Sequence, residues 1–293
     1  MNILLTGGGG FIGSNLTVLL SKFGEIYTIG RDSLNIDNHK QINFNNSYEI
    51  NDYFKKAPSF EVLVFLVGLA HNKGNKNNHD EHMFVNRNIL ETLVFSMKKY
   101  QKQKNFKIIF SSTISVYGES FRVSEYDENK PLYPLSPYAI SKKKAEEFLL
   151  KNHKHNSWVL RFAPVYSSNF SLNIDRRTKL YDLYFRVGNG NSKLSLCNIK
   201  NIKESFRAIL KGDVPSGIYN ISDSKIYNYN DLLQYQKAKY ILSIPNFFIY
   251  IIYLLTKRFN IVAIKENAIK LLKDNTYPAN KLMKYVNLDK ELN

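Results

Sequence analysis

The fold is decided by the stretch Thr6-Gly7-Gly8-Gly9-Gly10-Phe11-Ile12-Gly13, close to the start of the chain. The apolar run at residues 2–5 precedes it, as expected of a buried parallel strand. After it, apolar residues recur at helical spacing as far as residue 23. A glycine-rich turn therefore joins a buried strand to a helix N-terminus. There a dinucleotide pyrophosphate can meet free backbone N–H groups and the positive end of the helix dipole.

The glycines of this turn have a G-x-x-G-x-x-G spacing rather than G-x-G-x-x-G. We expect Gly7 to allow the tight turn, Gly10 the approach of the backbone to phosphate, and Gly13 the close contact of helix and strand. Phe11 and Ile12 complete the predicted cofactor-binding turn. The alternative is a glycine turn with no ligand, but the strand and helix on either side favour the ligand.

Composition narrows the class of protein. A chain of 293 residues suits one large or two modest domains, and a surplus of 41 Lys and Arg over 25 Asp and Glu favours anionic partners. The basic residues are spread along the chain, so nucleic-acid binding is disfavoured. Cys197 is the only cysteine, which fits a reducing cytosol. His79 and His82 have a metal-like spacing, but without a further His or Cys pair we expect no metal site.

No membrane-spanning segment is predicted. The strongest apolar stretch, residues 247–255, is too short to cross a bilayer, and no signal peptide precedes the first strand. We therefore expect a soluble cytoplasmic protein.

The second predicted strand, residues 25–29, ends in Gly30-Arg31-Asp32. An acidic residue at this strand end binds the ribose hydroxyls of NAD, whereas an Arg nearby suits the 2′-phosphate of NADP. Arg31 slightly favours NADP, and Asp32 keeps NAD possible. Arg31 as a simple solvated charge is the alternative.

Two further apolar runs, residues 62–67 and 107–110, indicate central parallel strands. Ligands of open α/β sheets bind at the carboxyl ends of the strands. We therefore expect Leu66, Val67 and Gly68 to border the cofactor.

A second group of polar residues points to hydride transfer. Thr113 lies at the end of the strand that begins at residue 107, and Tyr138 and Lys142 share one face of a predicted helix. Tyr138 would exchange a proton with a substrate oxygen that Thr113 also holds. The Lys142 ammonium would lower the tyrosine pKa from its usual value near 10 and bind the nicotinamide ribose. A Tyr-x-x-x-Lys pair by itself is usually structural, but its order after the turn and Thr113 favours catalysis.

Strands and helices alternate from residue 2 to residue 164, which predicts an α/β fold with a Rossmann doubly wound parallel sheet over residues 1–165. Residues 166–293 are predicted to be mainly a small C-terminal substrate-binding part, with some segments returning to the Rossmann domain. The apolar segment at 244–255 contains a proline and is followed by Lys257 and Arg258. We expect a packed helix there rather than one lying on a membrane surface.

At these residues the sequence resembles the extended short-chain dehydrogenase/reductases, in particular the nucleotide-sugar epimerases, dehydratases and reductases. Residues 6–13 resemble the family's T-G-G-x-G-F-I-G, residues 110–118 its F-S-S-[ST]-x-x-V-Y-G, and residues 136–142 its S-P-Y-x-x-S-K. Residues 85–86 and 160–162 fall where the family has V-N and L-R-P. The resemblance covers nearly the whole chain.

The resemblance implies an NAD(P)-dependent reaction on a nucleotide sugar, with Thr113, Tyr138 and Lys142 as the catalytic group. It also implies a C-terminal domain that holds the nucleotide diphosphate, where we expect Arg176 and Arg177 to bind substrate. A homodimer is possible.

Departures from the family pattern narrow the reaction. The 4,6-dehydratases carry Asp-Glu after the catalytic Thr, and Ile114 and Ser115 stand at those positions. Cys197 does not match the cysteine of epimerases that act at two ring carbons. Of the family's reactions, these departures leave oxidoreduction at C4 of the sugar, catalysed by a 4-epimerase or a 4-ketoreductase. The runner-up is a non-catalytic cofactor-sensing regulator, although such proteins usually lack the Tyr/Lys pair.

Other departures concern the substrate. Ala70 replaces the Lys of the UDP-galactose 4-epimerases, Pro164 an Asn common after the L-R strand, and Ser167 the Gly of Y-G. The proline-containing helix near residue 245 and the short tail after Lys281 most resemble bacterial reductases and epimerases of UDP-N-acetyl-6-deoxyhexoses in surface-polysaccharide pathways. The expected activity is therefore that of a UDP-sugar 4-epimerase or 4-ketoreductase, and Arg31 tilts it toward a reductase.

Overall fold

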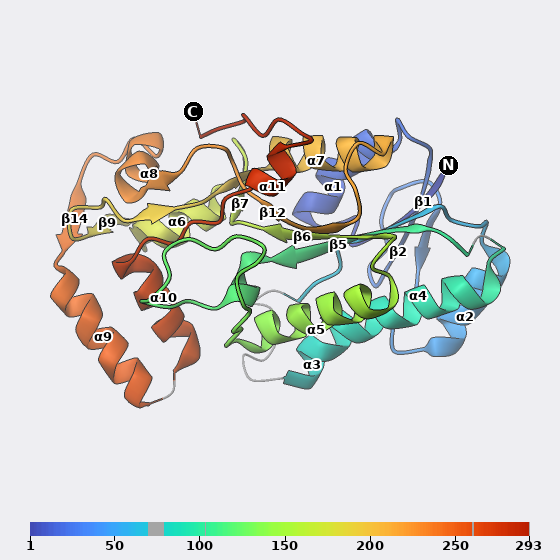
Figure 1. The fold of residues 1–293 in the computed structure, drawn as a ribbon, viewed down its shortest axis with the longest axis horizontal. Coiled ribbons are helices and arrows are strands. Elements are labelled where there is room, and N and C mark those ends of the chain that lie inside the picture. Colours follow the sequence, from blue (N-terminus) through green and yellow to red (C-terminus); the bar gives the residue numbers. More distant parts are fainter. Residues whose placement is uncertain (70–78, 103, 260, 293) are drawn as a thin grey trace. The chain divides into compact units, whose positions relative to one another are not determined.

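A computed structural model describes residues 1–69, 79–102, 104–259 and 261–292 (Figure 1). Its main sheet has seven strands in the order β12-β6-β5-β4-β1-β2-β3. The strands are β1 (Asn2–Thr6), β2 (Glu25–Gly30), β3 (His39–Gln41), β4 (Val62–Phe65), β5 (Lys107–Thr113), β6 (Ser157–Phe162) and β12 (Gly217–Ile221). From β1 the chain winds first through β2 and β3 and then, on the other side, through β4 and β5, with parallel pairing throughout. The predicted doubly wound α/β fold is confirmed.

The switch in winding direction falls between β1 and β4, whose residues pair from Ile3 with Val62 to Thr6 with Phe65. Ligands of doubly wound folds bind at this point, outside the carboxyl ends of the strands. β4 ends at Phe65, two residues before the end of the strand predicted at 62–67. β5 extends to Thr113, three residues beyond the end of the strand predicted at 107–110. The glycine turn and Thr113 therefore both leave the sheet at its carboxyl edge.

The helices that pack on this part of the sheet lie on both of its faces (Figure 1). α4 and α5 are side by side on one face, and α1 lies on the other. These helices and the ones between them are α1 (Phe11–Leu20), α2 (Ser47–Lys56), α3 (His79–Met83), α4 (Ile89–Tyr100) and α5 (Pro137–Asn152). A five-residue π-helix, Phe84–Asn88, links α3 to α4, and a 3-10 turn, Ile114–Tyr117, follows β5.

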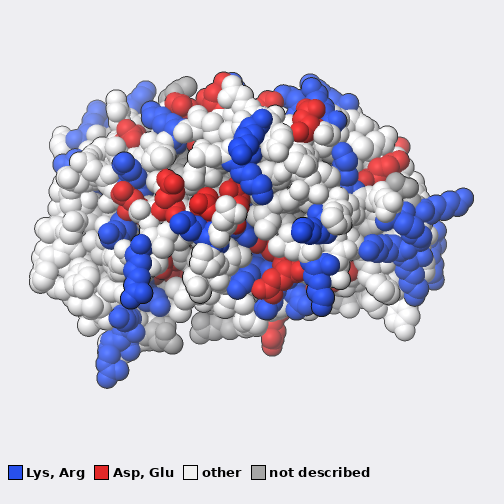
Figure 2. All heavy atoms as spheres, in the orientation of Figure 1, with Lys and Arg blue, Asp and Glu red and all other residues white. Residues whose placement is uncertain are grey.

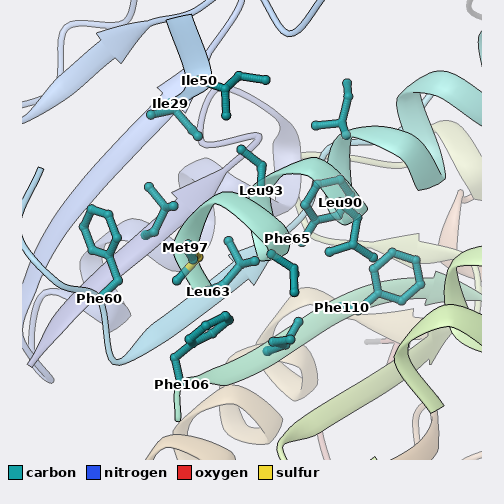
Figure 3. Close-up of a cluster of buried hydrophobic side chains, with 14 of the residues drawn as sticks. Ile29, Ile50, Phe60, Leu63, Phe65, Leu90, Leu93, Met97, Phe106 and Phe110 are labelled. Carbon is teal, nitrogen blue, oxygen red and sulfur yellow. The ribbon is translucent and has the colours of Figure 1, made fainter. Parts of the chain in front are cut away.

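The core between the sheet and α4 consists of interlocked aliphatic and aromatic side chains (Figure 3). Every residue of β4 is buried, as expected of a parallel strand covered on both faces. Burying one Leu or Phe side chain is worth about 1.5–3 kcal/mol. The labelled members of this cluster are Ile29, Ile50, Phe60, Leu63, Phe65, Leu90, Leu93, Met97, Phe106 and Phe110.

The chain divides into two compact units, and each is composed of separated segments. Unit 1 contains residues 1–113, 137–160 and 209–218, and unit 2 contains residues 114–136, 161–208 and 219–293. The assignment of substrate binding mainly to residues 166–293 stays a prediction.

Unit 2 holds short strands and several helices. Its three-stranded sheet has the order β14-β9-β8, and β10 pairs with β13 and β11 with β7. These strands are β7 (Val165–Tyr166), β8 (Lys179–Leu180), β9 (Leu183–Val187), β10 (Lys193–Leu194), β11 (Cys197–Asn198), β13 (Tyr227–Asn228) and β14 (Ile241–Ile244). The helices are α6 (Leu172–Thr178), α7 (Ile199–Lys211, with its end in unit 1), α8 (Tyr229–Tyr235), α9 (Asn246–Arg258), α10 (Val262–Leu272) and α11 (Asn280–Met283).

The predicted apolar helix is α9, but it is not packed as expected, because most of its apolar side chains are exposed. It begins directly after Pro245, because proline has a helix-compatible φ and needs no hydrogen-bond partner for its nitrogen. Among the described residues, no helix is both long and apolar enough to cross a bilayer.

Candidate functional site

The glycine turn is folded tightly against the loop that follows β4. Gly7 has φ +74°, and a Cβ there would lie 2.9 Å from the carbonyl carbon of Leu66. A Cβ on Gly13 would lie 2.2 Å from the Gly7 carbonyl oxygen, so only glycine lets α1 approach the turn this closely. The Gly10 N–H donates to the same oxygen at 3.1 Å, and α1 begins at Phe11.

This geometry fits a dinucleotide. The positive end of α1 points out of the turn, and no acidic residue lies in its first turn to oppose a phosphate. The Cβ-free surface at Gly7, Gly10 and Gly13 leaves the backbone open to close approach. Sequence reasoning missed Leu34, whose side chain would lie 2.9 Å from a Cβ on Gly9 and therefore covers one side of the turn.

The end of β2 presents its polar residues to solvent. Arg31 and Asp32 are both exposed, and their backbone carbonyls are held by side chains of β3. Gln41 donates to the Arg31 carbonyl at 2.7 Å, and the His39 ring lies 3.0 Å from the Asp32 carbonyl. The backbone at this strand end is therefore fixed while the guanidinium stays accessible.

Gly68 is part of the loop that follows β4 and faces α5, the helix that carries Tyr138 and Lys142. A Cβ on Gly68 would be 3.3 Å from the Lys142 Nζ and 3.3 Å from the Asn86 Oδ1. The Asn86 amide oxygen accepts from the Leu69 N–H at 2.9 Å, and its Nδ2 donates to the Ser141 hydroxyl at 2.9 Å. Asn86 thus ties the loop after β4 to α5.

Asn86 is the residue that sequence reasoning placed in a family motif but not in the site. It is fully buried and lies within the π-helix between α3 and α4. Such π-turns often occur at functional sites because they redirect a side chain within a helix. Its V-N motif was the available signal. Ala70, named above as a departure from the family pattern, lies outside the described residues.

Lys142 is buried against the ends of β4 and β5. Its ammonium donates to the carbonyl of Ser111 at 2.8 Å and to that of Val67 at 3.5 Å, and it lies 4.8 Å from the centre of the Phe110 ring. Burial lowers the pKa of Lys142 to about 7, and the carboxylate of Glu146 partly opposes this shift. Glu146, one helical turn further on, is itself buried and accepts from the Ser112 hydroxyl.

Tyr138 and Thr113 are joined by a hydrogen bond between their side chains. Burial raises the pKa of Tyr138 to about 12, although the bond from Thr113 works in the opposite direction. This direction is opposite to the lowering expected from Lys142, because desolvation dominates and Lys142 is not among the groups that shift this pKa. The His82 ring lies edge-on to Tyr138, with ring centres 6.4 Å apart.

The predicted basic pair on α6 separates. Arg176 is exposed, whereas Arg177 is partly enclosed and donates from Nη1 to the carbonyl of Asn173. Burial lowers the pKa of Arg177. Arg177 lines a small hollow of about 20 Å³ in unit 2 together with Ile114 and Pro164, two positions at which the sequence departs from the family pattern.

The rest of this hollow is aromatic and polar. Tyr229 and Tyr277 provide rings, and the side-chain oxygen of Asn275 is buried there without a hydrogen-bond partner among the described residues. The hollow has about the volume that one water molecule needs, and its guanidinium and unpaired amide oxygen offer that water polar partners.

Comparisons with known proteins agree with this arrangement. CDP-abequose synthase of Yersinia pseudotuberculosis is 27% identical over 246 residues, which cover 78% of this chain and 78% of that protein. ADP-L-glycero-D-manno-heptose-6-epimerase of Brachyspira hyodysenteriae is 34% identical over 181 residues, but the match covers only 56% of this chain and 54% of that protein.

The fold has counterparts among solved structures. The NAD complex of UDP-glucuronic acid 4-epimerase from Bacillus cereus aligns with a TM-score of 0.70 at 19% identity, over 100% of this chain and 94% of that one. The model of the "NAD dependent epimerase/dehydratase family" matches residues 3–221, which include the glycine turn, Thr113, Tyr138 and Lys142. The chain therefore belongs to the NAD dependent epimerase/dehydratase family.

Proposed function

We propose that this protein catalyses NAD(P)-dependent oxidoreduction at C4 of a nucleotide sugar, as a 4-epimerase or a 4-ketoreductase. The observation that carries the proposal is the side-chain hydrogen bond between Tyr138 and Thr113 at the end of β5, with Lys142 one helical turn further along α5. An acid/base, an anchor for the same oxygen and a cation within one turn are the groups that such a reaction needs.

Each group has one role in the proposed reaction. Tyr138 transfers a proton to or from the C4 oxygen, and Thr113 holds that oxygen by a hydrogen bond. The ammonium of Lys142 stabilises the phenolate of Tyr138. This stabilisation is needed because Tyr138 is buried and its pKa is high, while Lys142 lies buried one helical turn away. The bound dinucleotide supplies or accepts the hydride at C4.

The cofactor would lie across the switch point of the sheet. Gly7, Gly10 and Gly13 would hold the pyrophosphate at the start of α1, with Phe11 and Ile12 in the first helical turn. Along the loop after β4, the bordering residues would be Leu66, Val67 and Gly68. The family is NAD dependent. We propose a preference for NADP in this member because Arg31 is exposed where a 2′-phosphate would lie.

The substrate is proposed to be a UDP- or CDP-linked 6-deoxy sugar. The resemblance favours uridine, and the similarity to CDP-abequose synthase adds cytidine as a candidate. Arg177 would bind the diphosphate, and the choice of a 6-deoxy sugar rests on the resemblance. Ile114 and Ser115 offer no carboxylates for loss of water, so dehydration is disfavoured. We infer a place in surface-polysaccharide biosynthesis from the resemblance alone.

The test uses the purified full chain with UDP- and CDP-linked 4-keto-6-deoxyhexoses for the reductase and with UDP- and CDP-linked sugars that carry a C4 hydroxyl for the epimerase. A reductase consumes NADPH or NADH in proportion to product, whereas an epimerase interconverts the C4 epimers of a UDP sugar with no net use of added cofactor. If neither activity is detected across both nucleotides and both cofactors while dinucleotide binding is intact, the proposal is overturned.

A further inference from the structure

Exposed large apolar side chains are concentrated in one part of unit 2. Most of those in the described residues lie between residues 180 and 264 rather than being scattered over the chain. We use the name α9 face for the exposed members on α9 and immediately beside it. They are Tyr240, Ile241, Leu242, Phe247, Phe248, Tyr250, Ile252, Leu254, Leu255, Phe259, Ile261 and Ile264.

α9 is apolar on nearly all its sides but is covered on only one. Ile249 packs with Val187 and Ala268, and of the rest of α9 only Thr256 is also buried. Phe247 is 66% exposed and Phe248 is 55% exposed. A helix that is apolar all round is normally surrounded by protein or by lipid, and exposed apolar patches mark interaction surfaces.

The charges within the segment that carries the α9 face have one sign. Residues 232–265 contain no Asp or Glu, but they contain Lys237, Lys239, Lys257, Arg258 and Lys265. Figure 2 shows white atoms along the left edge, over α9 and β14 in the orientation of Figure 1, with Lys and Arg side chains beside them. This surface is therefore complementary to a partner that is both apolar and anionic.

Charge also distinguishes between possible partners. In a symmetric dimer through this surface, the same patch of each copy would face the other, so the five basic residues would meet like charges with no acidic residue in the segment to neutralise them. An anionic lipid bilayer has negative headgroups above an apolar interior, which matches both features.

The dimensions fit a helix that lies on the membrane rather than across it. The 13 residues of α9 extend about 20 Å, short of the roughly 30 Å apolar thickness of a bilayer. Apolar side chains such as those of Phe247, Phe248 and Phe259 are typical of the membrane-facing side of helices that lie in the bilayer interface.

We propose that the α9 face binds an anionic membrane surface. Phe247 and Phe248, at the start of α9, insert among the acyl chains, and Lys257 and Arg258, at its end, contact the phosphate headgroups. The protein would then act at the membrane surface without crossing it.

The test is co-sedimentation of the full chain with lipid vesicles. We expect binding to vesicles of phosphatidylcholine mixed with phosphatidylglycerol, weak binding to phosphatidylcholine alone, and release by high salt because exposed charges are screened. Lys257→Ala/Arg258→Ala should lower partitioning onto the anionic vesicles by roughly 30-fold. Phe247→Ser/Phe248→Ser should lower partitioning onto the same vesicles.

α4 provides matched controls. Lys98 and Lys99 form an exposed basic pair near its end, and Phe95 is 65% exposed on its surface. Lys98→Ala/Lys99→Ala and Phe95→Ser should bind vesicles as the parent chain does. Circular dichroism checks that every variant is folded.

Three results would overturn the proposal. The first is failure of the parent chain to bind the anionic vesicles, and the second is an equal loss of binding in the α4 controls. The third is self-association of the parent chain that Phe247→Ser/Phe248→Ser abolishes without any vesicle binding, because the α9 face would then be a contact between copies of the chain. Light scattering after gel filtration distinguishes that case.

Discussion

α4 and α9 are helices of nearly equal length, 12 and 13 residues, and both are rich in apolar side chains. α4 buries Ile89, Leu90, Leu93, Val94 and Met97 against the sheet of unit 1, whereas α9 buries only Ile249 among its apolar residues. The difference lies in what covers them, not in their composition. The buried side chains of α4 are specified by their neighbours, so changing them should affect folding. Changing the exposed apolar side chains of α9 should affect only binding to a partner.

The largest expected effect is on catalysis. Tyr138→Phe removes the hydroxyl that Thr113 binds, so turnover should fall by about 10²–10⁴-fold. Phe247→Ser, on the α9 face, should leave turnover in solution unchanged. The measurement is the rate of C4 conversion, with dinucleotide binding followed by fluorescence. Turnover that survives in Tyr138→Phe would mean that another group is the acid/base.

The next contrast concerns stability. Leu93→Ala on α4 opens a cavity in a fully buried core, and the free energy of unfolding should fall by about 2–5 kcal/mol. Leu254→Ala on α9 removes a side chain that is 46% exposed, so the change should stay within about 0.5 kcal/mol. Urea unfolding of both variants gives the comparison. A large loss in Leu254→Ala would show that α9 is covered in solution.

The third contrast concerns the pH dependence of stability. Because burial lowers the pKa of Lys142 from 10.5 to about 7, the unfolded chain binds one more proton than the folded chain between those values. The stability of the fold therefore rises with pH across that window. The cost of burying a charged Lys142 is fully present below pH 7.

Lys142→Met removes this contribution. The variant's gain in free energy of unfolding over the parent chain should be largest below the folded-state pKa of Lys142. This gain should fall as pH rises through the window, by on the order of 2 kcal/mol or more. Lys257→Met, at the exposed end of α9, is the control and should show no such trend. A parallel pair of curves for Lys142→Met and the parent chain would contradict the lowered pKa of the buried Lys142.

The smallest effect tests an exposed residue beside a ligand site. Arg31→Ala should reduce affinity for NADPH by roughly 10-fold, because one charge-assisted contact to the 2′-phosphate is lost, and leave affinity for NADH nearly unchanged. Asp32→Ala is the neighbouring control and should not lower affinity for NADPH. If Arg31→Ala lowered affinity for both cofactors equally, Arg31 would support the fold rather than discriminate between NADP and NAD.

Much of unit 1 was predictable because its signals are local. The glycine spacing, the apolar run of β4 and the helical spacing of Tyr138 and Lys142 each depend on residues close together in the chain. Element ends were less accurate: β4 stops at Phe65 and β5 continues to Thr113, since strand ends are set by pairing with neighbouring strands.

The sequence by itself determined the doubly wound fold and the order of the glycine turn, Thr113, Tyr138 and Lys142, because backbone periodicity and turn chemistry are encoded residue by residue. Only the tertiary structure placed Asn86 between the loop after β4 and Ser141 on α5, and Ile114 and Pro164 beside Arg177. It also decided that burial raises the pKa of Tyr138 and that α9 stays largely uncovered. These features depend on burial and on contacts between residues far apart in the chain, which no local pattern records.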